Sequence, residues 1–420
     1  MLLSMKRRFI LPGILLLYAL LTALLTAKDG GDFDVYLDAA QKLKAGANIY
    51  APPFVKGLQY YYSVFFALLL IPFSSQVFWT EVAWSLLSYY FLYRTFVLVS
   101  RDLDFSGMTT RQYRWWAVLT AVLALQFILY NVAMIQVTIF MLWAIFESIH
   151  LLDKRKDFGA GALLGLAINV KTLPIIMLGY LFYRGYWKAL GTALLTLTAL
   201  YFVPALFIGA DFNRFLHSEW WGVINPGNKE HLLETGIGLH SLVAFLPVYL
   251  TETQGEMEFR RHIWNLPLYQ VAIILQLARI FFLGLSLYLL KSRPFQREND
   301  PMKRLWEVSY FTLLIPLLLP HQQKYAFLLA LPLVSWILYF FIKTYPSGWT
   351  RGVRIAFGVF LFSALFFSPL YGSSIIGQFL FRFTQHYRLL TVATLLLIPI
   401  ALYCSPQRLR TSVFSPKAFS

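Results

Sequence analysis

Long stretches of apolar residues constrain this chain more than any other feature of its sequence. Of its 420 residues, 58% are hydrophobic and 13% charged, with 38 Phe, 25 Tyr and 12 Trp, more than the core of a soluble domain needs. A bilayer core about 30 Å thick takes roughly 20 apolar residues per helix. The sequence therefore predicts an all-α polytopic membrane protein with about 12 transmembrane helices. We expect them near residues 9–27, 77–99, 115–131, 134–152, 159–169, 172–184, 189–209, 266–290, 306–319, 325–342, 355–371 and 387–403.

The distribution of charge predicts how the chain is oriented. The first span follows Lys6, Arg7 and Arg8 and lacks a small-residue cleavage site, so we expect it to be retained rather than removed as a signal peptide. An even number of spans puts both termini on one side, and most basic residues fall in the loops of that side, which predicts cytoplasmic termini. The net charge of +16 then reflects topology and attraction to anionic head groups. The basic residues form no stripe that would bind nucleic acid, and the single Cys404 excludes an internal disulfide.

Carboxylates are scarce, and three of them follow the first span directly. Only 20 residues are Asp or Glu, yet Asp32, Asp34 and Asp38 lie within seven residues of one another. The apolar residues between and after them have the spacing of one helix face: Tyr36, Ala39, Ala40 and Leu43. We therefore expect a short helix on an apolar surface, ended by Gly46. Asp32 at its N-terminus either caps the helix or serves as a functional carboxylate.

Two long loops are expected on the outer side, at residues 28–76 and 210–265. The first contains Tyr60-Tyr61-Tyr62, which is either an aromatic belt at the membrane interface or a platform for sugars, the belt being favoured. Residues 64–73 are apolar but too short to cross, which indicates an interfacial or re-entrant helix, and residues 239–250 predict another short apolar helix. Three histidines of the second loop lack the tight spacing of metal ligands, so a solvated loop is favoured over a metal site: His217, His231 and His240.

Ionisable residues at membrane depth are costly and therefore point to function. Lys171 lies between two short apolar segments, where it either is functional or extends to the outer interface. His321 and Lys324 belong to a polar outer turn, which indicates either a wet cavity or an exposed hairpin. Arg279 falls within a span, where it either is functional or binds a backbone carbonyl or a Glu.

Two further patterns concern packing and the exclusion of other enzyme classes. Gly161 and Gly165 form a small-xxx-small pair, which predicts close helix packing. The sequence contains no internal repeat, nucleotide-binding loop or Gly-x-Ser-x-Gly elbow.

In their order along the chain, several short motifs resemble those of the GT-C superfamily of integral-membrane glycosyltransferases, and within it family 87, whose members depend on polyprenol-phosphate-mannose. The motifs are Asp32-Phe33-Asp34-Val35-Tyr36, Gly46-Ala47-Asn48-Ile49-Tyr50, Gln136-Val137, Gly161 to Pro174, Tyr183 to Lys188 and Pro320 to Tyr325. The chain departs from the family where relatives often have Tyr-Pro-Pro and Gly-Gln-Val-Asn. It has Tyr62-Ser63-Val64 and Ile135-Gln136-Val137-Thr138 there.

The resemblance implies a GT-C fold, with residues 1–420 as a single transmembrane glycosyltransferase domain whose two outer loops form the active-site face. It implies transfer of a hexose, with mannose expected, from a polyprenyl-phosphate-sugar donor to a lipid-linked or envelope glycan acceptor outside the plasma (inner) membrane. Asp32 is then expected to be the general base. The expected substrate-binding residues are Asp34, Tyr36, Tyr62, Gln136, Lys171, His240, His321 and Lys324.

Two neighbouring carboxylates make a poor metal site, so we expect transfer without a metal cofactor. The sequence leaves two other functions open. A transporter or flippase of lipid-linked sugars would favour paired broken helices around a midplane site, and a scaffold of envelope assembly would tolerate substitution near Asp32.

Overall fold

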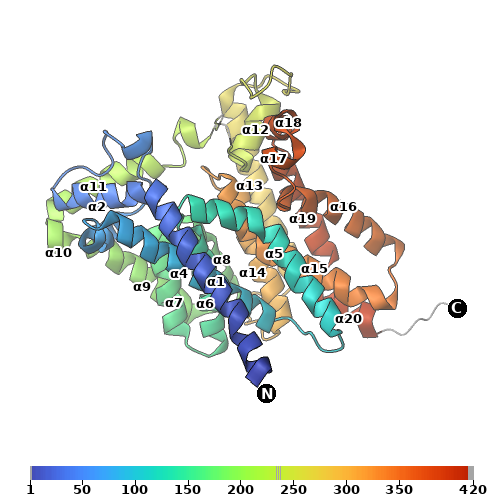
Figure 1. Ribbon diagram of the computed structural model, residues 1–420. Coiled ribbons are helices and arrows are strands. Elements are labelled where there is room, and N and C mark those ends of the chain that lie inside the picture. The colour runs from blue at the N-terminus through green and yellow to red at the C-terminus, as the bar shows by residue number, and fades with distance from the viewer. Residues whose placement is uncertain (1, 233, 235, 237, 415–420) are drawn as a thin grey trace. The chain divides into compact units, whose positions relative to one another are not determined.

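The computed structural model describes residues 2–232, 234, 236 and 238–414, and over these residues the protein is helical (Figure 1). Within that part of the chain, extended pairing is confined to an isolated bridge between Leu239 and Gln323. The main helices are α1 (Leu2–Asp29), α2 (Phe33–Lys44), α3 (Val64–Leu70), α4 (Val77–Arg101), α5 (Thr110–Ala133), α6 (Thr138–Asp153), α7 (Asp157–Val170), α8 (Ile176–Tyr183), α9 (Trp187–Phe202), α11 (Ala210–Ile224), α12 (Leu242–Leu250), α13 (Leu268–Leu290), α14 (Pro301–Leu318), α15 (Leu331–Thr344), α16 (Arg351–Phe367), α18 (Gln378–His386), α19 (Leu389–Tyr403) and α20 (Pro406–Phe414).

Each of the twelve predicted spans corresponds to a helix, but not every helix is long enough to cross a bilayer alone. Among the described residues, five segments combine sufficient length and apolar character, and up to seven do if each of two bent helix pairs counts as one span. The bends are 59° between α1 and α2 and 61° between α18 and α19. The chain is therefore an all-helical, polytopic membrane protein, while the GT-C fold and the number of about 12 spans stay predictions.

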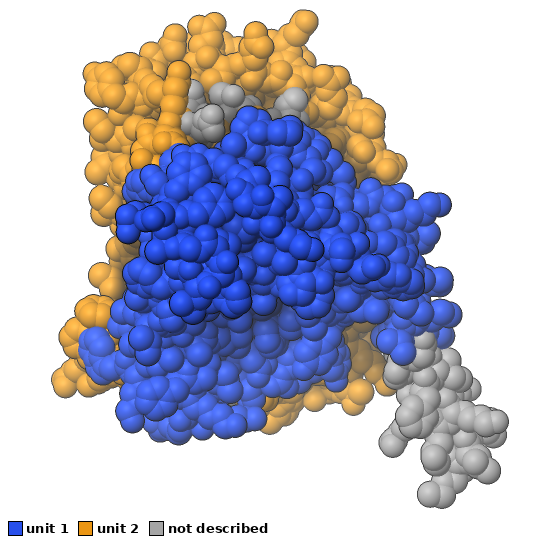
Figure 2. All heavy atoms as spheres, turned by 90° about the vertical axis from the view of Figure 1, so that its left-hand side faces the viewer, with its two compact units in different colours: residues 1–98, 129–175, 187–224 blue, residues 99–128, 176–186, 225–420 orange. Residues whose placement is uncertain are grey.

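The contacts within the chain divide it into two compact units, coloured separately in Figure 2. Unit 1 comprises residues 1–98, 129–175 and 187–224, and unit 2 comprises residues 99–128, 176–186 and 225–420. The single domain expected from the sequence stays a prediction. Each unit is described by itself below.

In unit 1, α7 packs closely on α9 and on α6. A Cβ atom at Gly165 would lie 2.7 Å from the Ala193 carbonyl oxygen of α9, and one at Gly161 would collide with the Ala189 carbonyl. The small-xxx-small pair therefore brings the two helix backbones together, as the sequence predicted.

The short helix α2 of unit 1 also forms as predicted. It ends at Lys44, and Gly46 follows with a φ of 71°, a conformation that glycine adopts without strain. All four residues of the predicted apolar stripe are buried, and the buried face is broader than predicted because it also includes Phe33, Val35 and Leu37. The short apolar helices expected at 64–73 and 239–250 are α3, with a 3-10 turn after it, and α12.

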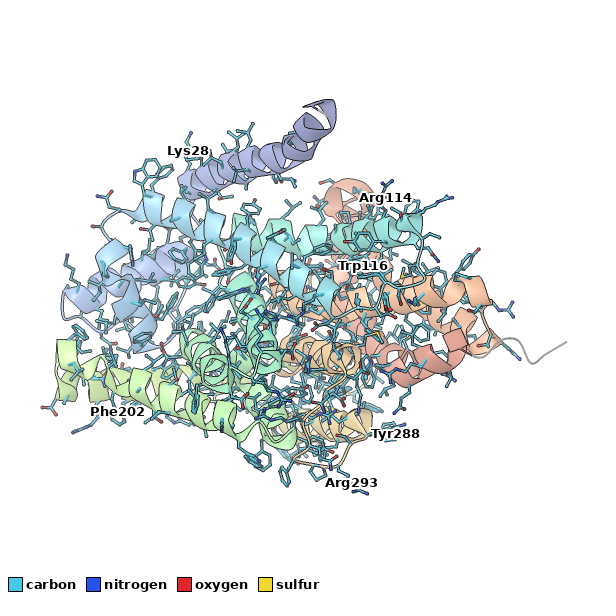
Figure 3. The ribbon with its side chains drawn as sticks, turned by 90° about the horizontal axis from the view of Figure 1, so that it is seen from below. Lys28, Arg114, Trp116, Phe202, Tyr288 and Arg293 are labelled. Carbon is cyan, nitrogen blue, oxygen red and sulfur yellow. The ribbon has the colours of Figure 1, made fainter. Side chains whose placement is uncertain are left out.

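Unit 2 is built around α14 and α15, whose residues are almost all buried. Two indole N–H groups tie other helices to this core. Trp116 of α5 donates to the Ser335 carbonyl at 3.1 Å, and Trp336 donates to the Cys404 carbonyl at 2.8 Å. Figure 3 shows Trp116 on the ribbon of α5. The buried Arg184 forms an ion pair with Glu307 of α14, so this arginine is a structural element of the core.

Both units expose large apolar side chains, as a surface in contact with lipid does. Phe202 of α9 in unit 1 is 59% exposed, and Tyr288 of α13 in unit 2 is 60% exposed (Figure 3). Along α1, exposed leucines recur from Leu15 to Leu25. Exposed apolar patches of this extent indicate membrane contact rather than a water-facing surface.

Candidate active site

The turn between α1 and α2 positions Asp32 in unit 1. The Asp32 amide donates to the Met134 carbonyl at 2.9 Å, so this turn is held against the junction of α5 and α6. A Cβ atom at Gly31 would lie 2.6 Å from the carbonyl carbon of Met134. Glycine is therefore required at position 31 for the two backbones to approach each other this closely.

The Asp32 carboxylate does not cap α2. Asp32 occupies the N-cap position, but its side chain makes no capping hydrogen bond. It accepts a hydrogen bond from the side-chain amide of Gln136 instead. The capping alternative is therefore wrong for this residue, and the carboxylate is available for another role.

Gln136 is the first link of a hydrogen-bonded chain that continues away from Asp32. The Tyr36 hydroxyl donates to Gln136 Oε1 at 3.4 Å and lies 2.6 Å from the Tyr62 hydroxyl. Lys171 Nζ in turn donates to the Tyr62 hydroxyl at 3.3 Å. The sequence singled out six residues of unit 1 as the base or as substrate ligands. The structure thus brings five of them together, all except Asp34.

The tyrosine cluster contributes to this chain from inside the protein. Tyr60 and Tyr62 are 1% and 7% exposed, and the Tyr60 hydroxyl donates to the Ser63 carbonyl at 2.9 Å. An aromatic belt would face the interface, so that prediction is wrong for these two rings. Ser63 comes directly after Tyr62. Its hydroxyl caps α3 and donates to Asn169 at 2.9 Å.

Lys171 lies in extended backbone directly after α7. Its ammonium is 5.2 Å from the centroid of the Tyr62 ring, within the range of a cation–π interaction. Burial lowers the pKa of Lys171 to about 8, and the negative charge of Asp32 opposes that shift. Lys171 therefore has partners inside the protein, and its role in binding the donor stays a prediction.

Burial and charge act in opposite directions on Asp32. Burial raises the pKa of its carboxyl above the usual value, whereas Lys171, Lys56 and the hydrogen bond from Gln136 lower it. A carboxylate with a raised pKa is a stronger proton acceptor while it remains ionised near neutral pH. That Asp32 acts as the general base stays a prediction.

Asp34 forms an ion pair with Lys56 at 2.7 Å instead. Glu81 of α4 is fully buried next to them and interacts electrostatically with both. Sequence reasoning missed Lys56 and Glu81, because neither belongs to a motif and their separation in sequence gives no sign of proximity. Whether Asp34 binds substrate stays a prediction.

In unit 1, the two predicted outer loops meet. Asn48 donates to Glu219 at 2.8 Å, and the indole of Trp220 donates to the Tyr61 carbonyl at 3.2 Å. These contacts connect residues 28–76 to the first part of the loop predicted at 210–265.

A second polar cluster lies in unit 2 and contains the other three predicted residues. The His240 amide donates to the Gln322 carbonyl at 2.9 Å, which joins the segment before α12 to the polar turn at 320–325. His321 Nδ1 is 3.0 Å from Glu234 Oε1, and the Lys324 ammonium lies 5.2 Å from the centroid of the Tyr371 ring.

His240 is buried in this cluster and carries no positive charge at neutral pH. Burial, together with the charges of Arg388 and Lys324, lowers its pKa to about 3. Glu234 and Arg388 were not singled out from the sequence, because each is an isolated charged residue in a loop or between helices. The turn at 320–325 is therefore part of a cationic cluster rather than an exposed hairpin.

The remaining predicted polar residues have structural surroundings. His217 stacks on Tyr201 with 3.7 Å between ring centroids, and its Nε2 lies 3.0 Å from the Tyr201 carbonyl. Over the described part of the chain, no three His, Cys, Asp or Glu residues are grouped as metal ligands. Arg279 donates to the Leu318 carbonyl at 3.0 Å, so the carbonyl alternative is confirmed for it.

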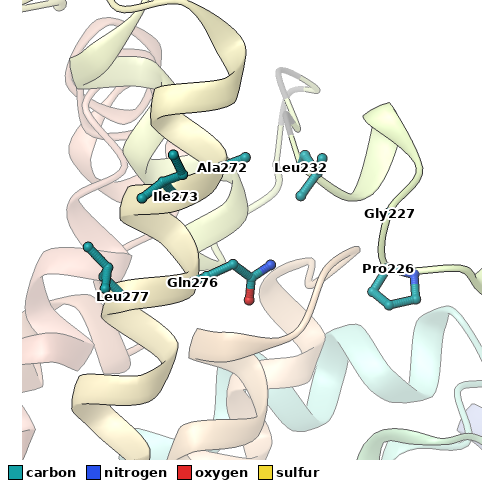
Figure 4. A pocket seen from close by; sticks show the side chains of 7 residues that line it. All are labelled: Pro226, Gly227, Leu232, Ala272, Ile273, Gln276 and Leu277. Atoms are coloured by element: carbon teal, nitrogen blue, oxygen red, sulfur yellow. The ribbon is translucent and has the colours of Figure 1, made fainter.

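Unit 2 also contains an apolar cavity of about 460 Å³ between α13 and the loop after α11 (Figure 4). Gln276 projects from α13 toward this loop and is the one polar side chain among the residues that line the cavity (Figure 4). The lining consists of Pro226, Gly227, Leu232, Ala272, Ile273, Gln276 and Leu277.

Comparison with known families finds a similarity over part of the chain. The sequence model of glycosyltransferase family 87 matches residues 60–253. Over these residues the chain is similar to glycosyltransferases of family 87. The matched segment contains Tyr62, Gln136, Lys171 and His240, whereas Asp32 precedes it. No curated protein and no solved structure matches the chain.

Proposed function

We propose that this protein is a glycosyltransferase that moves a hexose, with mannose expected, from a polyprenyl-phosphate donor to a lipid-linked or envelope glycan acceptor on the outer face of the plasma membrane. The observation that carries the proposal is the chain Asp32–Gln136–Tyr36–Tyr62–Lys171. It joins a carboxylate with a raised pKa to a partly buried cation. Glycosyl transfer from a lipid phosphate needs these two kinds of group.

In the proposed reaction, Asp32 takes the proton of an acceptor hydroxyl. The acceptor oxygen forms a bond to the anomeric carbon of the sugar, while the bond from that carbon to the phosphate oxygen breaks. The electron pair of the broken bond stays with the polyprenyl phosphate. Lys171 stabilises the negative charge that gathers on this leaving group, and fixed charges of this kind are among the largest contributions to catalysis.

The cluster of unit 2 supplies further groups for the donor. We propose that His321 and Lys324 bind its phosphate and that the neutral His240 contributes a hydrogen bond. The apolar cavity beside α13 has the chemistry to hold part of an isoprenoid chain. A sugar donor carried by a lipid also fits a sequence without a nucleotide-binding loop.

The test of this function is the Asp32→Asn variant, with Asp38→Asn as its matched control. Asn keeps the shape of the side chain and removes the base, so we expect kcat to fall by about 10² to 10⁴ while expression and donor binding are retained. Asp38 lies on the same helix and pairs with Lys42 at 2.8 Å, and its variant should remain active. The assay uses radiolabelled polyprenyl-phosphate-mannose with a membrane extract as the source of acceptor.

Two results would contradict the assignment in different ways. Loss of activity in Asp34→Asn with normal activity in Asp32→Asn would mean that the neighbouring carboxylate is the base. Normal activity in both variants would refute the proposed enzyme mechanism.

We further propose that transfer needs no divalent metal. Because a hard cation such as Mg²⁺ prefers about six oxygen ligands, two neighbouring carboxylates hold it weakly. Treatment of the purified protein with EDTA should leave the rate of transfer unchanged. Loss of activity that Mg²⁺ or Mn²⁺ restores would overturn this expectation.

A further inference from the structure

Lys56 reaches the turn that carries Asp32 from a loop more than twenty residues further along the chain. Its Nζ lies 2.7 Å from Asp34 Oδ2 and donates to the Gly31 carbonyl at 3.4 Å. The backbone of Lys56 has a φ of 54°, which is uncommon for a residue other than glycine. The loop therefore holds an unfavourable backbone conformation at the position whose ammonium contacts the turn.

The surroundings of this ammonium resemble those of a bound cation. Glu81 is 0% exposed, and its carboxyl lies close to the Asp34 side chain and to the Gly31 backbone. Its carboxyl interacts electrostatically with Asp34 and Lys56. Gly30 leaves room for the arrangement, since a Cβ atom there would lie 3.1 Å from Lys56 Nζ and 2.5 Å from Asp34 Oδ2.

We propose that Lys56 is a positioning residue whose ammonium takes the place of a divalent cation between Asp34, Glu81 and the Gly31 carbonyl, and so fixes the turn from which Asp32 projects. This inference rests on the proposed role of Asp32 as the base. Without the ammonium, the adjacent carboxyl groups of Asp34 and Glu81 would lose the positive charge beside them, and the turn would lose the contact that closes it.

Lys56 also affects the charge on Asp32. The charged or titratable groups that act on Asp32 are Lys171, Lys56, Tyr62 and Tyr130. Asp34 and Glu81 in turn interact with Lys56. Because the positive charge of Lys56 lowers the pKa of Asp32, its removal should move the acid limb of kcat/KM toward higher pH. A purely structural lysine would change stability without moving this limb.

The experiment compares the full-length wild type with Lys56→Ala, Lys56→Arg and the control Lys44→Ala in detergent. Lys44 is an exposed lysine at the end of α2, and Lys56 is itself 42% exposed, so all variants should fold. We expect Lys56→Ala to lose at least about tenfold in kcat, because positioning a reacting group contributes strongly to rate. Lys56→Arg keeps the charge and should retain most activity.

The second readout does not depend on activity. Removal of the ammonium leaves the Asp34 and Glu81 carboxyl groups and the Gly31 carbonyl without a cation, and water can complete the coordination of a hard cation there. Lys56→Ala should therefore bind Mn²⁺, detected by electron paramagnetic resonance, and should unfold at a higher temperature in its presence. The wild type and Lys44→Ala should do neither. The proposal is overturned if Lys56→Ala has the wild-type rate and acid limb, or if it binds no more Mn²⁺ than Lys44→Ala.

A failure of the proposed function can be distinguished from a failure of the inference about Lys56. If Asp32→Asn retains normal transfer, the base assignment fails. Mn²⁺ binding by Lys56→Ala would then still support the cation site, and its absence would still refute it.

Discussion

At the scale of single residues, the properties of Asp32 and Lys171 depend on each other. The two side chains come from segments far apart in the sequence and are joined through Tyr62, Tyr36 and Gln136. Burial makes the charged form of each less favourable, while the opposite charge of its partner favours that form. Each residue therefore titrates closer to neutral pH than it would in water.

This pairing predicts the pH dependence of transfer. Asp32 must be ionised to act as a base, so kcat/KM should fall on the acid side at a pH above the ordinary pKa of an aspartate. Lys171 must be protonated, and because its pKa is about 8, kcat/KM should also fall above that pH.

In Lys171→Met the alkaline limb should vanish and the acid limb should move to higher pH, because a charge that lowers the pKa of Asp32 is gone. A full pH profile of both proteins checks this. If Lys171→Met keeps the wild-type rate and the wild-type KM for the donor, Lys171 only extends to the outer membrane interface and has no role in transfer.

At the scale of elements, the packing of α7 on α9 determines where Lys171 lies. Lys171 follows α7 directly, and α7 contacts α9 through the glycine face described above. Between helices in lipid, close backbone packing replaces the hydrophobic effect as the source of association. A change at this face should therefore affect both stability and the position of Lys171.

The variant Gly165→Ala tests this packing. Its Cβ would lie 2.7 Å from the Ala193 carbonyl oxygen, and overpacking of this kind typically costs about 1 to 3 kcal/mol. We expect a lower unfolding temperature in detergent. The control is Gly191→Ala in α9, where a Cβ meets nothing within 4 Å. That variant should be as stable as the wild type or more stable, because alanine favours helix. Equal stability of the two variants would contradict close packing at Gly165.

At the scale of the whole molecule, each unit is a helical body with an apolar exterior and a polar cluster of its own. Unit 1 contains the proposed base, and unit 2 contains the cationic cluster around Lys324. The proposed reaction requires both clusters to be reached from the outer side of the membrane. The orientation predicted from the charge distribution is therefore a condition of the proposed function.

Cysteine labelling checks this orientation. The native Cys404 is fully buried, so a membrane-impermeant maleimide should not label the wild type. Lys44 and Lys154 are exposed positions of unit 1 that are predicted to lie on opposite sides of the membrane. In intact cells the reagent should label Lys44→Cys and leave Lys154→Cys unlabelled until the cells are permeabilised. The reverse labelling pattern would place the termini outside and the proposed site on the cytoplasmic side of the membrane.

The sequence by itself determined the features that depend on local pattern. Long apolar stretches predicted the helices, the spacing from Tyr36 to Leu43 predicted the buried face of α2, and Gly161 with Gly165 predicted a close helix contact. These predictions succeed because periodicity and residue size act within a few turns of one helix.

Only the tertiary structure decided which polar groups meet. The bond from Gln136 to Asp32 joins residues 104 positions apart, and the sequence contains no pattern that specifies this pairing. The same holds for Lys56 beside Asp34 and for Tyr62, whose ring is buried rather than placed in an interfacial belt. The physical reason is that a side chain's charge and hydrogen bonds depend on neighbours brought close by helix packing, whereas a local pattern specifies only the face on which it lies.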